Sequence, residues 1–337
     1  MAGTIFEGSE EVFLANVEEA KAHNAGGKST WTAGVNKFSG LTKEEFKAYI
    51  GRGYSKSAAA MSAVKKQALP LDLSTHVPVV DLPGSIDWRT KNPPVVTKVK
   101  DQGGCGGCWS FSAAETAESN VAINTGKLFV FSEQEILACT PNPDQCGGTG
   151  GCSGATQELA FAYIMSAGIT TEAQWPYTMQ SGVCNWSGKK PVANFTGWYE
   201  LPVNNYTALM NQVNVQPIAI SAAAGPWQSY DKGVFSCPND GICDTDVDHA
   251  IVLEGYGTDA QKGDYYLVRN SWSAGWGEAG YIRVARYGTS SSKGEPCAED
   301  KTPGDGDGCK GGPSQIQVCG VTGILSDSSV VTGGYLL

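Results

Sequence analysis

One cysteine and one histidine, far apart in the sequence, could together form a nucleophile and its base. The chain has three histidines, at positions 23, 76 and 249. His23 and His76 lie in a stretch that is predicted below to be removed, so His249 alone could serve Cys108. A thiol is a strong nucleophile at neutral or acidic pH only when a nearby cation holds it as a thiolate. Imidazole can supply that cation because its charge changes near physiological pH.

The motif around this cysteine, Gln102-Gly-Gly-Cys105-Gly-Gly-Cys108-Trp109, permits other interpretations. Half of a zinc site is one, but the sequence has no second cysteine pair with this spacing. A thioredoxin-like redox pair is another, yet that motif has a tryptophan before its first cysteine, whereas Trp109 follows the second. Two structural cysteines in a disulfide-rich domain are the third. Because the cysteine count is odd, one thiol must stay unpaired, which favours a nucleophile beside a disulfide.

The cysteines also indicate the compartment. All 11 lie at or after position 105, as expected of a disulfide framework formed in an oxidising environment. Three N-glycosylation sequons, at Asn185, Asn194 and Asn205, agree with a secretory route. The first residues lack the basic flank and apolar stretch of a signal peptide, so we expect the signal to be absent from this chain. No apolar run is long enough to span a membrane, so no membrane partner is expected.

Charge and local composition divide the chain into two parts. The net charge of −10 argues against a nucleic-acid partner, which would need clustered Lys and Arg. Residues 10–24 are mostly good helix formers, and Thr42 with Glu45 forms a capping box for a second short helix. Residues 51–80 are small, polar and basic, which is typical of a linker. Denser sequence begins after residue 80, so we expect a boundary there.

The second part starts with helices and continues with strands. Helices are predicted over residues 109–124 and 152–167, and the first would stabilise a Cys108 thiolate at its N-terminus. Strands are predicted over residues 218–222, 250–256, 265–270 and 281–285. This order predicts an α+β chain of two lobes. His249 precedes one strand, and Asn270 ends another beside Trp272. An amide there could accept the imidazole N–H and fix its tautomer, while an indole shields the bond from water.

These motifs resemble the papain-like cysteine peptidases, in the zymogen form of the cathepsin L-like branch. The motif from Gln102 to Trp109 matches the family's nucleophile region, and His249 and Asn270 match its base and orienting amide. Ile86-Asp-Trp88-Arg89 matches the start of the mature enzyme. Phe13, Asn16, Ala20 and Asn24, followed by Gly34-x-Asn36-x-Phe38, match the inhibitory pro-segment.

The resemblance implies a papain-like fold, with a helical left lobe and a sheet-rich right lobe on either side of an active-site cleft. Residues 1–80 would be the inhibitory pro-segment, and residues 81–337 the peptidase. The implied catalytic residues are Cys108, His249 and Asn270, with Gln102 in the oxyanion hole and Trp109, Trp272 and Trp276 in support. Hydrolysis would pass through a thioester acyl-enzyme.

The chain also departs from the family pattern. Gly107 replaces the usual Ser or Ala before the nucleophile, and Gly40 replaces an expected Asp. The first half of the helical pattern is missing, with Ile5 and Ser9 where Glu and Arg are usual. We therefore expect a pro-segment that is shortened at its N-terminus and inhibits less strongly.

Substrate contacts are also implied by the resemblance. The backbone of Gly154 and Ala155 would pair with substrate, and Ala155 replaces a usual glycine. The pocket for the residue second from the scissile bond, on its N-terminal side, would be lined by Thr156, Ser221, Ala250 and Ile324. Because the floor position is not acidic, we expect an apolar or aromatic side chain there, with Arg disfavoured. No His-His occluding loop is present, so an endopeptidase is favoured over a carboxydipeptidase.

The resemblance implies the disulfides Cys105–Cys152, Cys139–Cys184 and Cys243–Cys319. It leaves Cys146, Cys237, Cys297 and Cys309 with three possible pairings. Two of these four lie in an insertion over residues 287–318, which also holds an Asp305-Gly-Asp307-Gly turn. A calcium loop needs more carboxylates at fixed spacing, so we expect a surface loop and no metal site or cofactor.

Protein and peptide substrates, the chain's own pro-segment and cystatin-type inhibitors are the expected partners of a monomer. A lysosome, an acidic vacuole or the extracellular space is the expected location. The competing hypothesis is a catalytically inactive homologue that acts as a binding or storage protein.

Overall fold

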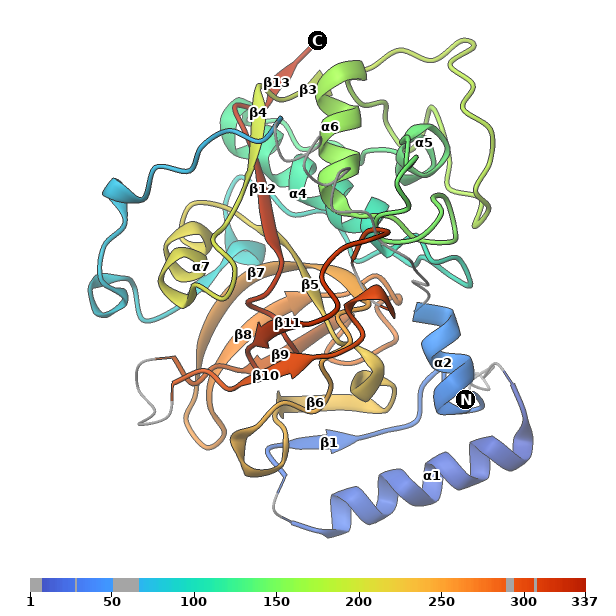
Figure 1. The fold of residues 1–337 in the computed structure, drawn as a ribbon, viewed down its shortest axis with the longest axis vertical. Helices are drawn as coiled ribbons and strands as arrows, with labels where there is room; N and C mark the ends of the chain where they lie inside the picture. Colours follow the sequence, from blue (N-terminus) through green and yellow to red (C-terminus); the bar gives the residue numbers. More distant parts are fainter. Residues whose placement is uncertain (1–7, 28, 51–66, 289–293, 306–307) are drawn as a thin grey trace.

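The computed structural model describes residues 8–27, 29–50, 67–288, 294–305 and 308–337. Ile5, most of the predicted linker and Asp307 therefore lie outside the described residues. Figure 1 shows helices α4, α5 and α6 gathered above a twisted sheet, with the N-terminal helices α1 and α2 beside and below that sheet.

The N-terminal segment forms helix α1 (Glu10–Ala25), strand β1 (Trp31–Ala33) and helix α2 (Lys43–Ile50). The predicted capping box at the start of α2 is confirmed. The Glu45 N–H donates to Thr42 Oγ1 at 3.1 Å, and the Thr42 N–H donates to Glu45 Oε2 at 2.8 Å. Asn16 Nδ2 joins α1 to the chain before α2 by donating to the carbonyls of Ser39 and Leu41 at 2.9 Å each.

The next helices are α4 (Cys108–Thr125), α5 (Glu133–Cys139), α6 (Gln157–Ala167) and α7 (Tyr206–Val213). Helix α4 ends one residue later than predicted, at Thr125, because Gly126 takes a left-handed conformation with φ 73°. Helix α6 begins five residues later than predicted. Cys152 is held by a disulfide to Cys105, and Gly154 has φ +87°, so the backbone between them cannot be helical.

One large sheet carries the second lobe. Its strand order is β1-β6-β9-β8-β7-β5-β12-β4, and β2 also pairs with β7. The pairs are antiparallel except for β6 with β9. The bounds of these strands are β2 (Ile86–Asp87), β4 (Gly197–Glu200), β5 (Ile218–Ala222), β6 (Tyr230–Phe235), β7 (His249–Asp259), β8 (Gly263–Arg269), β9 (Tyr281–Ala285) and β12 (Ser328–Thr332).

Two small pairs lie apart from the large sheet, β10 (Cys297–Asp300) with β11 (Ile316–Cys319) and β3 (Ala193–Asn194) with β13 (Tyr335–Leu336). Short 3-10 turns are found at Leu73–Thr75, Val79–Asp81, Trp88–Thr90, Gly225–Trp227, Pro238–Asp240 and Pro303–Asp305.

The molecule has two main buried apolar clusters. One lies among helices α4, α5 and α6 and includes Trp109 and Phe161. The other covers the sheet, and it contains Phe38 and Phe46 of the N-terminal segment together with Trp272. The N-terminal segment therefore shares a hydrophobic core with the sheet-rich lobe, so its release must expose apolar surface.

Ten cysteines form five disulfides. Cys105–Cys152 and Cys139–Cys184 are present. The expected Cys243–Cys319 bridge is wrong, because the structure has Cys237–Cys243, Cys297–Cys319 and Cys146–Cys309 instead. The reason is local geometry. The β10–β11 pairing sets Cys297 directly opposite Cys319, and a short turn over residues 238–240 returns Cys243 to Cys237.

In its described residues, 287–288, 294–305 and 308–318, the insertion has more regular structure than the surface loop we expected. It contains the β10–β11 pair, and Cys309 is buried where it joins Cys146 beside helix α6. The insertion is thus tied to the helical lobe at one point and to the segment before β12 at another.

Candidate active site

The thiol of Cys108 lies at the first residue of α4, directly after the Gly107 cap. Ser110 Oγ donates to the Gly107 carbonyl at 2.8 Å and fixes this first turn. One turn further on, Ser112 Oγ donates to the carbonyl of Ile251 in β7 at 2.7 Å. Cys108 and Ala250 belong to the same buried cluster. The helix that carries the thiol is therefore fastened to the strand that begins with His249.

The imidazole of His249 has a defined orientation. Its Nε2 lies 2.8 Å from Asn270 Oδ1, which also accepts the Ser271 N–H at 2.7 Å. Because that oxygen accepts both bonds, Nε2 must carry the proton, and Nδ1 is the nitrogen with a lone pair. Nδ1 is buried and makes no hydrogen bond within the described part of the chain. His249 can therefore take a proton at Nδ1 while Asn270 holds its other side.

Aromatic rings enclose this contact. Trp272 stacks on the imidazole with ring centroids 4.7 Å apart and an angle of 24° between the planes. Trp276 meets Trp272 edge to face at 4.9 Å. Trp109, on the other side of the site, donates its indole N–H to the Gly151 carbonyl at 3.2 Å. The rings exclude water, which strengthens the His249–Asn270 hydrogen bond.

The side chain of Gln102 is also fixed. Ser271 Oγ donates to Gln102 Oε1 at 2.6 Å, and Gln102 Nε2 donates to the Cys105 carbonyl at 3.1 Å. An amide nitrogen has two hydrogens, so one N–H remains for a ligand. Ser271 follows Asn270 directly, so the same loop orients both amides.

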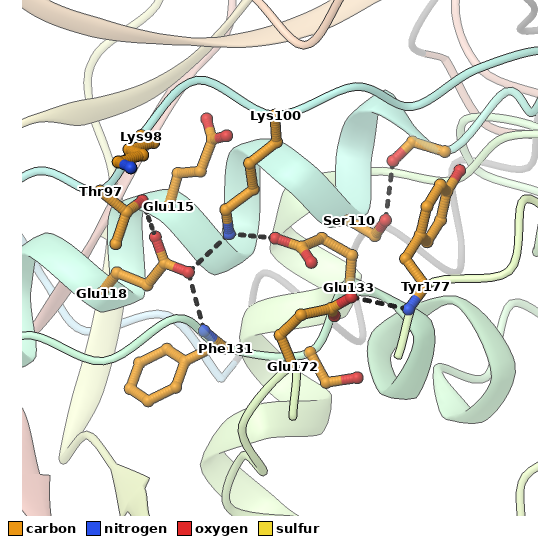
Figure 2. Close-up of polar contacts among 12 residues, drawn as sticks. Thr97, Lys98, Lys100, Ser110, Glu115, Glu118, Phe131, Glu133, Glu172 and Tyr177 are labelled. Carbon is orange, nitrogen blue, oxygen red and sulfur yellow. Dashed lines mark hydrogen bonds and ion pairs between the residues drawn. The ribbon is translucent and has the colours of Figure 1, made fainter. Parts of the chain in front are cut away.

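A buried charge cluster supports the Gln102 loop (Figure 2). Lys100 donates to Glu118 Oε1 of α4 at 2.6 Å and also pairs with Glu133 of α5. Glu118 accepts two more hydrogen bonds, from Thr97 Oγ1 at 2.6 Å and the Phe131 N–H at 2.8 Å. Burial by itself lowers the pKa of Lys100. The negative charges of Glu118 and Glu133 raise it by more, so the pKa lies above its ordinary value and the amine stays protonated.

A second buried cluster surrounds Arg269, the residue before Asn270. Its Nη2 lies 3.1 Å from Glu115 of α4, and its Nη1 lies 3.5 Å from Glu254 of β7. The guanidinium is 1% exposed. Arg269 therefore connects the elements that carry Cys108, His249 and Asn270. These charged residues were not predicted from the sequence. A signal was present, because Glu115 and Glu118 lie inside a helix that was predicted to be buried, and buried carboxylates need cations opposite them.

The expected substrate residues lie where α6 meets the sheet. Ser221 of β5 is paired with Ala250, the residue after His249. Thr156 occupies the N-cap position of α6 without a side-chain capping hydrogen bond, and Ile324 is buried before β12. Gly154 has the left-handed backbone that favours glycine, and Ala155 is fully buried. Two residues that sequence reasoning missed join this group. Asp327 Oδ2 accepts hydrogen bonds from Ser221 Oγ at 2.5 Å and from Gln157 Nε2 at 2.7 Å.

The N-terminal segment lies against the site. Phe38 and Phe46 both meet Trp272 edge to face at 5.3 Å. Lys47 of α2 pairs with the carboxylate of Asp246, three residues before His249. Cys108 and His249 are both fully buried while the N-terminal segment is in place. A large substrate cannot reach either residue in this state.

The three glycosylation sequons differ in accessibility. Asn194 is 8% exposed and its side-chain nitrogen donates to the Met165 carbonyl at 3.2 Å, so it cannot carry a sugar in this fold. Asn185 is exposed, while Asn205 is partly buried and caps α7.

Within the described ranges, no group of three or more His, Cys, Asp or Glu side chains could hold a metal ion. No helix there is long and apolar enough to cross a membrane.

The chain is similar to known proteins over most of its length. The profile described as papain family cysteine protease matches residues 82–302, and the cathepsin propeptide inhibitor domain (I29) matches residues 7–46. The senescence-specific cysteine protease SAG39 of Oryza sativa subsp. indica is 38% identical over 280 residues, which cover 82% of this chain and 77% of that protein. Fruit bromelain of Ananas comosus is 37% identical, with coverage of 84% and 76%. A recombinant stem bromelain precursor has a similar structure, with a TM-score of 0.73, 33% identity and coverage of 96% and 90%.

Proposed function

The chain belongs to the papain family of cysteine proteases, and from this premise we propose that Cys108 is the nucleophile, His249 its base and Asn270 the residue that orients the imidazole. It is a cysteine-type endopeptidase made as a zymogen with an I29 inhibitor domain. The observation that carries the assignment is the 2.8 Å contact from His249 Nε2 to Asn270 Oδ1, which leaves Nδ1 for the thiol.

In the reaction, His249 takes the thiol proton and the sulfur of Cys108 attacks the carbonyl carbon of the scissile peptide bond. The oxyanion accepts hydrogen bonds from Gln102 Nε2 and the Cys108 N–H. The C–N bond then breaks, and His249 gives its proton to the departing amine, which leaves a thioester. Water, deprotonated by His249, attacks the thioester, and the carboxylic acid leaves as the thiol is restored.

Residues 1–80 act as the inhibitory pro-segment and residues 81–337 as the peptidase. The contacts of Phe38 and Phe46 with Trp272 support this division. Ala250 and Ile324 supply apolar walls for the residue second from the scissile bond, which fits an apolar or aromatic side chain. The mature enzyme works as a monomer that cystatin-type inhibitors can block.

An acidic vacuole, a lysosome or the extracellular space is the place of action. Five disulfides support an oxidising route of synthesis. Asn185 and Asn205 are the two sequons that we expect to carry sugar.

The test is intact mass after acid activation and incubation with a peptidyl-epoxide inhibitor of thiol peptidases. We expect one adduct on a fragment that begins near residues 78–83, and none on the Cys108→Ala variant. A processed and folded wild-type protein without an adduct would show that Cys108 is inert, and the assignment would fail.

A further inference from the structure

A cluster of polar side chains, which are buried except for the partly buried Asp327, lies next to the candidate active site and has no role in the mechanism above. Its centre is the carboxylate of Asp327, which accepts hydrogen bonds from Ser221 at 2.5 Å and from Gln157 at 2.7 Å. Ser221 is paired across the sheet with Ala250, and Ala250 follows His249 directly. The cluster therefore lies one residue away from the proposed base.

The hydrogen bonds of this cluster are incomplete. Because Gln157 Nε2 donates to Asp327, the other end of the amide, Oε1, must be an acceptor. Gln157 Oε1 and the neighbouring Thr156 Oγ1 are both buried and have no hydrogen-bond partner among the residues that the structure describes. The Gln157 side chain is 0% exposed. Buried acceptors are normally satisfied, so these oxygens point to a donor that is missing from the zymogen.

The charge of the cluster is negative. None of the described residues forms an ion pair with Asp327. Glu158, the residue after Gln157, is also acidic, so it supplies no positive charge to balance Asp327. Burial, with Asp327 and Glu200 nearby, raises the pKa of Glu158 to about 8, so at acidic pH it is a neutral acid that accepts from Ser329 Oγ at 2.6 Å. A cationic side chain would balance the negative charge of Asp327 and could donate hydrogen bonds to the unsatisfied acceptors.

We propose that Asp327 and Gln157 form a recognition site for a Lys or Arg side chain at the second position N-terminal to the scissile bond. This inference rests on the proposed function, because that function identifies Ala250 and Ile324 as walls of the pocket. The aliphatic stem of the substrate residue packs on Ala250 and Ile324, as long basic side chains do on apolar surfaces. Its charged end donates to Asp327 and to Gln157 Oε1.

The sequence-based expectation disfavoured Arg because position 324 is not acidic. The folded chain supplies the carboxylate from position 327 instead, three residues further on and bonded to a wall of the same pocket. The pocket therefore accepts a basic side chain as well as an apolar or aromatic one, because its apolar walls remain.

The experiment uses acid-activated enzyme from the full chain, with active sites counted by titration with a peptidyl epoxide. Peptidyl-coumarin substrates that differ at the second position alone (Arg, Lys, Leu and Phe) give kcat/KM for each. For wild type we expect the Arg and Lys substrates to be cleaved within about tenfold of the Leu substrate. Asp327→Asn should lower kcat/KM for Arg and Lys by roughly tenfold or more, with less than about threefold change for Leu.

Two further variants separate recognition from folding. Gln157→Glu adds a carboxylate at the unsatisfied acceptor and should raise the ratio of Arg to Leu cleavage. Glu299→Gln removes one exposed negative charge that does not belong to this cluster. It should leave the ratio of Arg to Leu cleavage unchanged. If Asp327→Asn lowers all four substrates equally, or if wild type rejects Arg and Lys, the inference is overturned while the peptidase assignment stands. If wild type cleaves none of the four and takes no epoxide, the proposed function itself fails.

Discussion

The guanidinium of Arg269 lies 3.1 Å from the carboxylate of Glu115, and both side chains are almost fully buried. Arg269 directly precedes Asn270, and Glu115 lies two turns along the helix that begins with Cys108. A single ion pair thus connects the loop that orients the imidazole to the helix that carries the thiol.

Breaking this pair should be costly. In Arg269→Met the carboxylates of Glu115 and Glu254 would stay buried without a cation, so we expect the free energy of unfolding to fall by about 3–5 kcal/mol. Urea denaturation of the zymogen measures the loss. Arg283→Met is the matched control, because Arg283 also pairs with two carboxylates but is partly exposed. The control should lose about 1 kcal/mol. Equal losses in the two variants would contradict the special role of the buried pair.

The Gln102 amide should act on the transition state. Gln102→Ala removes one proposed oxyanion donor, and we expect kcat to fall by about 10²-fold with little change in KM. Ser271→Ala keeps the donor but removes the 2.6 Å hydrogen bond that orients it. Its kcat should fall by a smaller factor. A rise in KM with unchanged kcat for Gln102→Ala would mean that the amide binds substrate only.

The Lys47–Asp246 pair should hold the pro-segment. Asp246 is buried on the sheet-rich lobe, while Lys47 comes from α2 of the pro-segment. Its hydrogen bond to Asp246 raises the pKa of Lys47. In Lys47→Met the Asp246 carboxylate would be buried without its cation, which weakens the contact between the pro-segment and the sheet-rich lobe. The zymogen should therefore be processed faster at a given acidic pH.

Lys43→Met is the matched control for this prediction. Lys43 pairs with Glu19 at 3.0 Å, and both residues are exposed and belong to the pro-segment. Time courses of processing on a gel compare the two variants. Equal rates for Lys47→Met, Lys43→Met and wild type would show that the Asp246 contact does not restrain activation.

Several strands were predictable because their residues alternate or are uniformly apolar. The predictions for residues 218–222 and 281–285 are confirmed to the residue, as β5 and β9. The α4 prediction is right to within one residue at each end. Cys108, His249 and Asn270 could be singled out because their residue types at those spacings match a known motif.

What sequence could not predict depends on tertiary contacts. Cys319 lies opposite Cys297 only because the insertion folds into a hairpin, and a sequence gives no register for an insertion. Asp327 is the one acidic residue between positions 308 and 337, but only the fold brings it to Ser221 and Gln157. Lys100 and Arg269 were overlooked because a charged residue in an apolar pattern is ordinarily taken as exposed.

Stability should depend on pH through Glu158. Burial is the main cause that raises the pKa of this carboxyl from 4.5 to about 8. Between these values the folded chain keeps the proton that the unfolded chain has lost, so stability is greatest in acid and falls as pH rises. The slope from this one group is at most about 1.4 kcal/mol per pH unit.

The measurement is urea denaturation between pH 4 and 9 in a Cys108→Ala background, which prevents self-processing. Glu158→Gln should flatten the fall in stability, because the amide has no proton to lose. Glu299→Gln, at an exposed position, should follow the parent curve. A Glu158→Gln curve parallel to the parent would show that Glu158 does not set the pH dependence.

The pairing of β1 with β6 has a consequence for the enzyme after activation. In the zymogen, Trp31 and Thr32 of the pro-segment lie opposite Gly233 and Lys232 of β6. Cleavage of the pro-segment removes that neighbour and leaves the outer N–H and C=O groups of β6 facing water. Such an edge can pair with a strand from another molecule. Maturation thus uncovers a sheet edge, and Asp231 and Lys232, adjacent charges on that strand, oppose its pairing with a second molecule.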